Sequence, residues 1–235
     1  MTSVQRMFLI AFWIAALSTG NLVTAADYPA SLELELQSAL ELGVRDSTDP
    51  YLLTKVASLY LDLGDDLYQE KEKRLAAYEE GAQFARRALE LQEVSAEAHF
   101  LYAANLGSAA QLKGLMASAM VVQTLKRHVH RTLELKSDHA PALHMMGAML
   151  EQLPWFLGGD GKAALESMKR AVGTDPNYAH ARLDLAKMYL KRHDSESAKQ
   201  ELRLLVNLEH PCDQYAWTSR YRPEGLKLLA ALNVD

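Results

Sequence analysis

PNYAHARLDLAKMYLKRHDSESAKQELRLLVNLEHP, residues 176–211, has the length and punctuation of a single helix–turn–helix repeat. Tetratricopeptide repeats have a period of about 34 residues. Leu185, Ala186 and Tyr189 supply the large, small and aromatic side chains that the first helix requires. Ala198 follows Ala186 by 12 residues and supplies the small residue of the second helix. Because one such pair cannot bury its apolar face alone, the pattern predicts a stack of pairs with a concave binding surface.

The preceding unit has the same pattern with a longer connection. Gly147 and Ala164 are 17 residues apart, whereas the corresponding residues of the next unit are 12 apart. The additional residues fall in LPWFLGGD, residues 153–160. Proline and paired glycines end the first helix, and Asp160 can cap the second. Two interpretations remain for the large apolar pair Trp155 and Phe156: they fill a gap between neighbouring helices, or they contact a ligand or partner.

Helical periodicity continues through the rest of the chain, and no alternating run bounded by turn residues predicts a strand. The segment 114–135 predicts an unusually long helix of roughly 33 Å at 1.5 Å per residue. Further helices are expected over residues 32–42, 51–63, 71–91, 96–111 and 224–232. The fold class is therefore all-α, an irregular tetratricopeptide-like helical repeat stack (an α-solenoid), over residues 27–235.

Residues 1–26 have the pattern of a secretory signal peptide. A single basic residue, Arg6, precedes an apolar run, and small residues follow at 23–26. We expect cleavage after Ala25 or Ala26 and a periplasmic or secreted protein; the alternative is an uncleaved anchor. The junction has no cysteine for lipid attachment, and the single cysteine, Cys212, cannot form an intramolecular disulfide.

Composition and motifs argue against catalysis and against nucleic acid as a partner. The net charge is −5, and basic residues form no cluster. His128 and His130 would point in opposite directions on a helix, and no HxxxH, HExxH, GxSxG or phosphate-loop motif occurs. We therefore expect neither an enzyme nor a cofactor, and no metal site.

The expected binding groove follows from the register of the first helix in each repeat. Its inner face consists of positions three before the small residue and one, four and five after it. Together with the 153–160 insert, these positions give the candidate ligand or partner residues Leu101, Asn105, Ser108, His144, Glu151, Trp155, Phe156, Leu183 and Lys187. Asn105 has a second interpretation, because a buried amide can instead bond a neighbouring backbone. The aromatic and basic segment 215–222 is expected either to fold over the last helix or to dock a partner.

Four features together carry a family resemblance: AHFLYAANLG at residues 98–107, Gly114, Gly147 and the insert PWFLGGD at 154–160. With them, the chain resembles the T-component family of tripartite ATP-independent periplasmic (TRAP) transporters. It also resembles the related regulators of microtubule dynamics. The resemblance implies a non-catalytic stack of irregular helical repeats beside a periplasmic substrate-binding protein, with small apolar ligands. The chain departs from the family's lipoprotein members because it has no cysteine at the signal junction.

These observations lead to two hypotheses about function. The first is an exported binding protein that assists a periplasmic substrate-binding protein or TRAP-type transporter and handles a small hydrophobic ligand. The alternative is a general envelope scaffold for protein–protein interaction, with homo-oligomers as one form of assembly. An enclosed apolar channel would favour the first hypothesis, and an open charged groove would favour the second.

Overall fold

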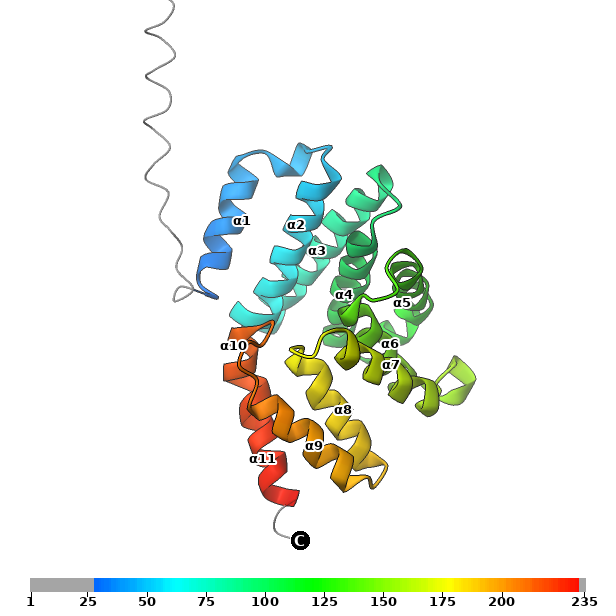
Figure 1. Cartoon of the computed structure of the whole chain (residues 1–235). Helices are drawn as coiled ribbons and strands as arrows, with labels where there is room; N and C mark the ends of the chain where they lie inside the picture. The colour runs from blue at the N-terminus through cyan, green and yellow to red at the C-terminus, as the bar shows by residue number, and fades with distance from the viewer. Residues whose placement is uncertain (1–27, 233–235) are drawn as a thin grey trace, which may run out of the picture.

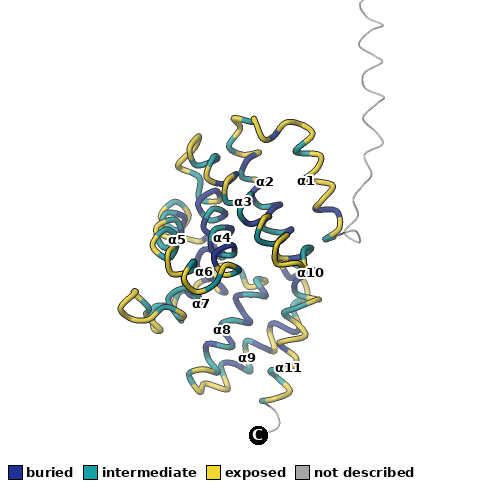
Figure 2. Tube along the Cα trace, turned by 180° about the vertical axis from the view of Figure 1, so that it is seen from behind, coloured by how far each residue is buried: buried dark blue, intermediate teal, exposed yellow. Residues whose placement is uncertain are grey.

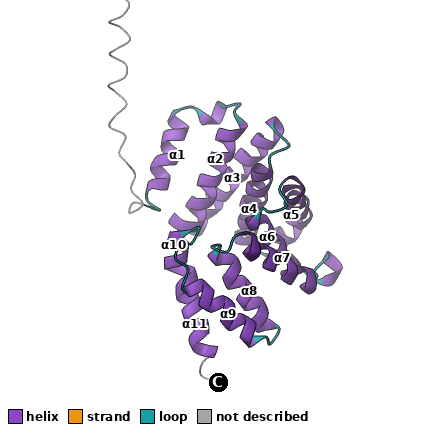
Figure 3. Cartoon of the chain, in the orientation of Figure 1, coloured by secondary structure: helices purple, strands orange, loops and turns teal. Residues whose placement is uncertain are grey.

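The computed structural model describes residues 28–232, and its regular structure is entirely helical (Figure 1). Figure 3 shows helices joined by short loops, with no strand in this range. The expected signal peptide, residues 1–26, lies outside the described residues. Within those residues, no helix combines the length and apolar character needed to cross a bilayer.

The helices follow one another with short connections. In chain order they are α1 (Ser31–Glu41), the 3-10 turn η2 (Val44–Asp46), α2 (Pro50–Asp62), the π-helical turn η3 (Leu63–Leu67), α3 (Lys71–Leu91), α4 (Ala96–Lys113), α5 (Leu115–Leu135), α6 (Ala140–Gln152), the 3-10 turn η4 (Trp155–Leu157), α7 (Gly161–Thr174), α8 (Ala179–Lys191), α9 (Ser195–Val206), α10 (Gln214–Ala216), the π-helical turn η5 (Trp217–Tyr221) and α11 (Arg222–Leu232). The expected all-α solenoid is confirmed, including the long α5.

Local capping explains where several helices begin. The Asp49 carboxylate accepts hydrogen bonds from the first backbone amides of α2, and Pro50 occupies the first helical position. Asp160 caps α7 in the same way, and Asp194 caps α9. Each cap satisfies amides that have no partner within the helix, typically worth about 1 kcal/mol. The helix start predicted from Asp160 is therefore confirmed.

Consecutive helices pack as antiparallel pairs, α2 with α3, α4 with α5, α6 with α7 and α8 with α9 (Figure 1). Ala164 and Ala198 are completely buried at the centres of the last two pairs. A Cβ added at Gly147 would lie 3.0 Å from the backbone oxygen of Ala164, so α6 and α7 approach closely there. These positions confirm the repeat register read from the spacing of small residues.

The core runs through the stack as adjoining clusters of buried side chains. Figure 2 shows buried residues recurring along the trace in successive helices. Leu53 and Phe84 belong to the N-terminal cluster, and Leu143 and Met168 to the middle one. Leu202 lies in the cluster that α8, α9 and the C-terminal segment share. Each large side chain contributes about 1.5–3 kcal/mol by leaving water, so stability is distributed along the stack.

The C-terminal segment returns to the start of the described chain. Figure 1 shows α10 beside the lower ends of α1 and α2. The rings of Tyr28 and Tyr215 meet edge to face with centroids 5.5 Å apart. Trp217 also donates from Nε1 to the backbone oxygen of Leu205, 2.8 Å away on α9. Segment 215–222 thus packs over α9 and also reaches the N-terminal helices.

Candidate functional site

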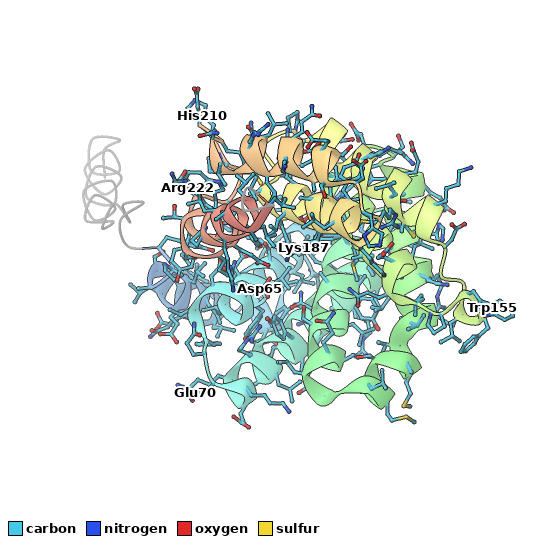
Figure 4. The ribbon with its side chains drawn as sticks, turned by 90° about the horizontal axis from the view of Figure 1, so that it is seen from below. Asp65, Glu70, Trp155, Lys187, His210 and Arg222 are labelled. Carbon is cyan, nitrogen blue, oxygen red and sulfur yellow. The ribbon has the colours of Figure 1, made fainter. Side chains whose placement is uncertain are left out.

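Polar side chains from distant parts of the chain meet on one side of the stack, which we call the inner surface. We define it by Asp65, His144, Tyr178, His180, Asp184, Lys187, Arg220 and Tyr221. These residues come from η3, α6, α8 and η5 and from the turn before α8. In Figure 4, Asp65 and Lys187 lie near the middle of the molecule, whereas Trp155 and His210 lie at its edges.

Two histidines and an aspartate form the centre of this surface. His144 Nε2 lies 2.9 Å from Asp184 Oδ2, and its Nδ1 lies 3.1 Å from the Tyr178 hydroxyl. His180 Nε2 lies 3.5 Å from the same Asp184 oxygen. The His180 ring stacks on Tyr221 with centroids 4.7 Å apart. Each ring is therefore held in orientation by a second group.

The environment keeps the Asp184 carboxylate charged and the His180 imidazole neutral. Burial, followed by the charge of His144, lowers the pKa of His180 to about 4. Burial raises the pKa of Asp184, but the hydrogen bond from His144 and the neighbouring positive charges outweigh it and leave the pKa below its usual range. At neutral pH, Asp184 is thus an anionic acceptor beside a neutral imidazole.

Arg220 joins the C-terminal segment to η3. Its guanidinium donates to the backbone oxygen of Asp65 and to Oδ1 of Asp66, both at 2.6 Å. Asp66 also accepts a hydrogen bond from the Tyr28 hydroxyl, and Asp66 is buried. Such charge-assisted bonds are stronger than neutral ones. These bonds join two parts of the inner surface that lie about 155 positions apart in the chain.

Carboxylates around η3 are only partly neutralised. Burial, together with the charges of neighbouring aspartates, raises the pKa of Asp62 to about 7. Burial also raises the pKa of Asp65, although Tyr78 donates to it and Arg220 and Arg74 lie near. Asp65 is nevertheless exposed to solvent.

The structure brings together only some of the residues predicted for the groove. His144 and Lys187 lie on the inner surface, where Lys187 Nζ contacts Glu224 at 2.9 Å and Asp184 at 3.6 Å. Ser108 is half-buried on α4. Glu151 instead joins neighbouring repeats, because it accepts from Arg192 at 2.6 Å and Lys191 at 2.7 Å.

Besides His144, which is 8% exposed, three further predicted groove residues are buried. Leu101 and Leu183 are 2% and 1% exposed, because neighbouring helices cover the positions that the register rule assigned to an open face. Asn105 is completely buried and donates from Nδ2 to the backbone oxygens of Ala57 and Leu101. Its amide therefore has a structural role that ties α4 to α2.

The gap-filling interpretation of Trp155 and Phe156 is wrong. Their exposed fractions are 84% and 67%, and their rings contact each other edge to face. Figure 4 shows Trp155 projecting from the edge of the molecule, away from the inner surface. They are not packed because η4 leaves the stack: Gly159 turns the chain beside Leu153, and Lys126 donates to the oxygen of Leu157.

Sequence reasoning missed His180 and Asp184. It named segment 215–222, which contains Arg220 and Tyr221, as a possible docking segment but did not place it on this surface. One signal was available in the sequence. His180 and Asp184 are four residues apart, and this spacing places both side chains on the same face of a helix. No local signal related these residues to His144 or to η3, because those contacts depend on how the repeats stack.

The fold and the polar inner surface define the class of protein: a tetratricopeptide-like scaffold for protein interaction. A tetratricopeptide-repeat family model matches residues 156–218. A second model, described as regulator of microtubule dynamics protein 1-3, matches residues 28–150. The second match covers more than half of the chain, and the chain belongs to this family.

Individual relatives agree with this assignment. Regulator of microtubule dynamics protein 1 of Bos taurus is 31% identical to this protein, over 74% of the present chain. The same protein of Pongo abelii is also 31% identical, over 76% of the present chain. The matches span 60% and 62% of those relatives' own lengths. Regulator of microtubule dynamics protein 3 of Bos taurus is 27% identical, over 75% of the chain and 40% of that relative.

Solved structures show the same architecture. A thermophilic tetratricopeptide-repeat protein from Thermus thermophilus superposes with a TM-score of 0.62 at 13% identity, over 95% of this chain and 98% of that one. MamA from Desulfovibrio magneticus superposes with a TM-score of 0.51 at 18% identity, over 78% and 89% of the two chains. At such low identity, the likeness concerns the fold alone.

Proposed function

We propose that the protein is a non-catalytic scaffold that holds a basic segment of a partner protein on its inner surface. The observation that carries this proposal is a set of aspartates in and beside η3 whose charges are only partly neutralised. The pKa of Asp65 stays raised although Arg74 and Arg220 lie near, and burial together with neighbouring aspartates raises the pKa of Asp62. A lysine or arginine from a partner would relieve this repulsion and form charge-assisted hydrogen bonds.

Peptide binding to the full chain tests this proposal. Fluorescence anisotropy would compare lysine- and arginine-rich peptides with acidic peptides of equal length. Basic peptides should bind, with an affinity that falls as salt rises, and Asp65→Asn should weaken the binding. Asp138→Asn makes the same chemical change at an exposed position outside the inner surface and should leave it unchanged. Equal binding of both peptide classes, or equal effects of both variants, would refute the proposal.

The finer proposal places this scaffold outside the cytosol. It rests on the signal-like pattern of residues 1–26. The charged inner surface supports a general envelope scaffold over a TRAP-type accessory protein that handles a small hydrophobic ligand. Cell fractionation with N-terminal sequencing tests the location: a soluble protein beginning near residue 26 is expected. Recovery only in membranes with Met1 retained would mean that the segment is an anchor.

Family membership favours a second candidate, a role in microtubule dynamics like that named for the relatives. The match over residues 28–150 supports it. Co-sedimentation of the purified full chain with polymerised tubulin tests it directly. Pelleting that depends on polymer supports this candidate, and retention of the chain in the supernatant at all tubulin concentrations eliminates direct binding.

A further inference from the structure

The histidines and the aspartate at the centre of the inner surface also have the arrangement of a metal site. Within the described residues, His144, His180 and Asp184 are the group whose donor atoms all lie within 4.8 Å of one another. His180 and Asp184 are one helical turn apart on α8, and His144 faces them from α6. Two rigid helices therefore present three donors toward one point.

The distances are close to those that a bound ion requires. Zinc ligands at about 2.0–2.2 Å in a tetrahedral arrangement are separated from one another by roughly 3.4 Å. Asp184 Oδ2 is 2.9 Å from His144 Nε2 and 3.5 Å from His180 Nε2. Modest rotations of the side chains would open the triangle around an ion without moving either helix.

The donor chemistry selects the class of ion. Imidazole nitrogens suit zinc and other late divalent transition metals, whereas calcium and magnesium prefer an all-oxygen shell. Two histidines and one carboxylate are a ligand set found in zinc sites that keep a further position for water or a second molecule. We propose that His144, His180 and Asp184 bind a divalent transition-metal ion, for which Zn²⁺ is the best match.

Neighbouring groups support this assignment. Metal-bound histidines usually have their second nitrogen held by a hydrogen-bond partner. Tyr178 provides that partner, because its hydroxyl lies 3.1 Å from His144 Nδ1. With Nε2 on the ion, Nδ1 carries the proton and donates to the Tyr178 oxygen.

One charge opposes an ion and offers a sharp test. Lys187 Nζ lies 3.6 Å from Asp184 Oδ1, although Glu224 holds it at 2.9 Å on the other side. Removing this charge should strengthen metal binding, which a purely structural role of the cluster would not predict. Lys187→Gln should therefore bind Zn²⁺ more tightly than the parent, and Lys71→Gln, an exposed change on α3, should not.

Calorimetric titration of the untagged, chelator-treated full chain with zinc chloride is the direct experiment. One equivalent of Zn²⁺ should bind, and magnesium or calcium in excess should not compete. His180→Gln and Asp184→Asn should abolish this binding, and Tyr178→Phe should weaken it by about tenfold. His210→Gln, an exposed histidine outside the cluster, should bind as the parent does.

Visible absorption with Co²⁺ in place of Zn²⁺ would report the coordination shell, and thermal melts without metal would show that each variant folds. Absence of Zn²⁺ binding by the parent would overturn the proposal. Binding by folded His180→Gln equal to that of His210→Gln would overturn it as well. Because no peptide is present, failure here leaves the proposed partner contact untouched, and failure of the peptide experiment leaves the metal site untouched.

Discussion

The α6–α7 and α8–α9 repeats make the same central contact but have very different connections. In both pairs an aspartate caps the second helix, and an alanine four residues later, Ala164 or Ala198, is completely buried. Residues 192–194 suffice to connect α8 to α9, whereas residues 153–160 connect α6 to α7. The extra residues project from the edge and leave the contact intact. Small residues, rather than loop length, thus set the geometry of the pair.

Substitution of the two central alanines should have the largest effect. Ala198→Arg and Ala164→Arg each place an unpaired charge in a fully buried contact, which costs several kcal/mol. Urea unfolding followed by circular dichroism should show similar losses in both variants. Gln200→Arg adds the same side chain on the exposed face of α9 and should change little. A parent-like midpoint for either alanine variant would break the equivalence of the two repeats.

The longer connection should depend on Gly159. A Cβ at this position would lie 1.8 Å from the backbone oxygen of Leu153, so the chain must shift to accept one. Gly159→Ala should therefore reduce the free energy of unfolding by about 1–3 kcal/mol, the usual cost of overpacking. Gly173→Ala is the control, because nothing lies within 4 Å of its added Cβ. Equal stability of the two variants would show that the turn rearranges freely.

The two repeats should also differ in pH response through His180. Its folded pKa near 4 lies below the unfolded value of about 6.5. Between these values the unfolded chain binds more protons, so stability is retained above pH 6.5 and declines as the pH falls toward 4. His180→Gln should show a smaller drop in melting temperature between pH 7.5 and 5 than the parent. His210→Gln should match the parent; identical drops in all three proteins would contradict the assignment.

Trp155 should have the smallest effect on stability. Because its side chain is 84% exposed, Trp155→Ala should change the free energy of unfolding by less than about 0.5 kcal/mol. Phe84→Ala, which empties a buried aromatic site, should instead cost about 3–5 kcal/mol. Thermal melts and partner binding should be measured on the same samples. A stable Trp155→Ala protein that loses partner binding would place a contact at the edge of the stack; a large loss of stability would contradict its exposure.

The sequence by itself determined the helices and the way they pair. Helix starts follow from local hydrogen bonds, such as those to Asp49 and Asp160, and pairing follows from the spacing of small residues such as Ala198. Both signals lie within a few turns of one chain segment, where backbone geometry is regular. Periodicity is therefore enough to place them.

Only the tertiary structure decided which polar residues meet and which apolar ones remain exposed. His144 reaches Asp184 from another repeat, and Arg220 reaches Asp65, which lies 155 residues earlier in the chain. These contacts depend on the small rotation between successive pairs and on the π-helical turns η3 and η5, which periodicity does not encode. Trp155 shows the converse, since a large apolar side chain packs only if another element covers it. Contacts between distant repeats depend on how every repeat between them is packed, so no local sequence pattern encodes them.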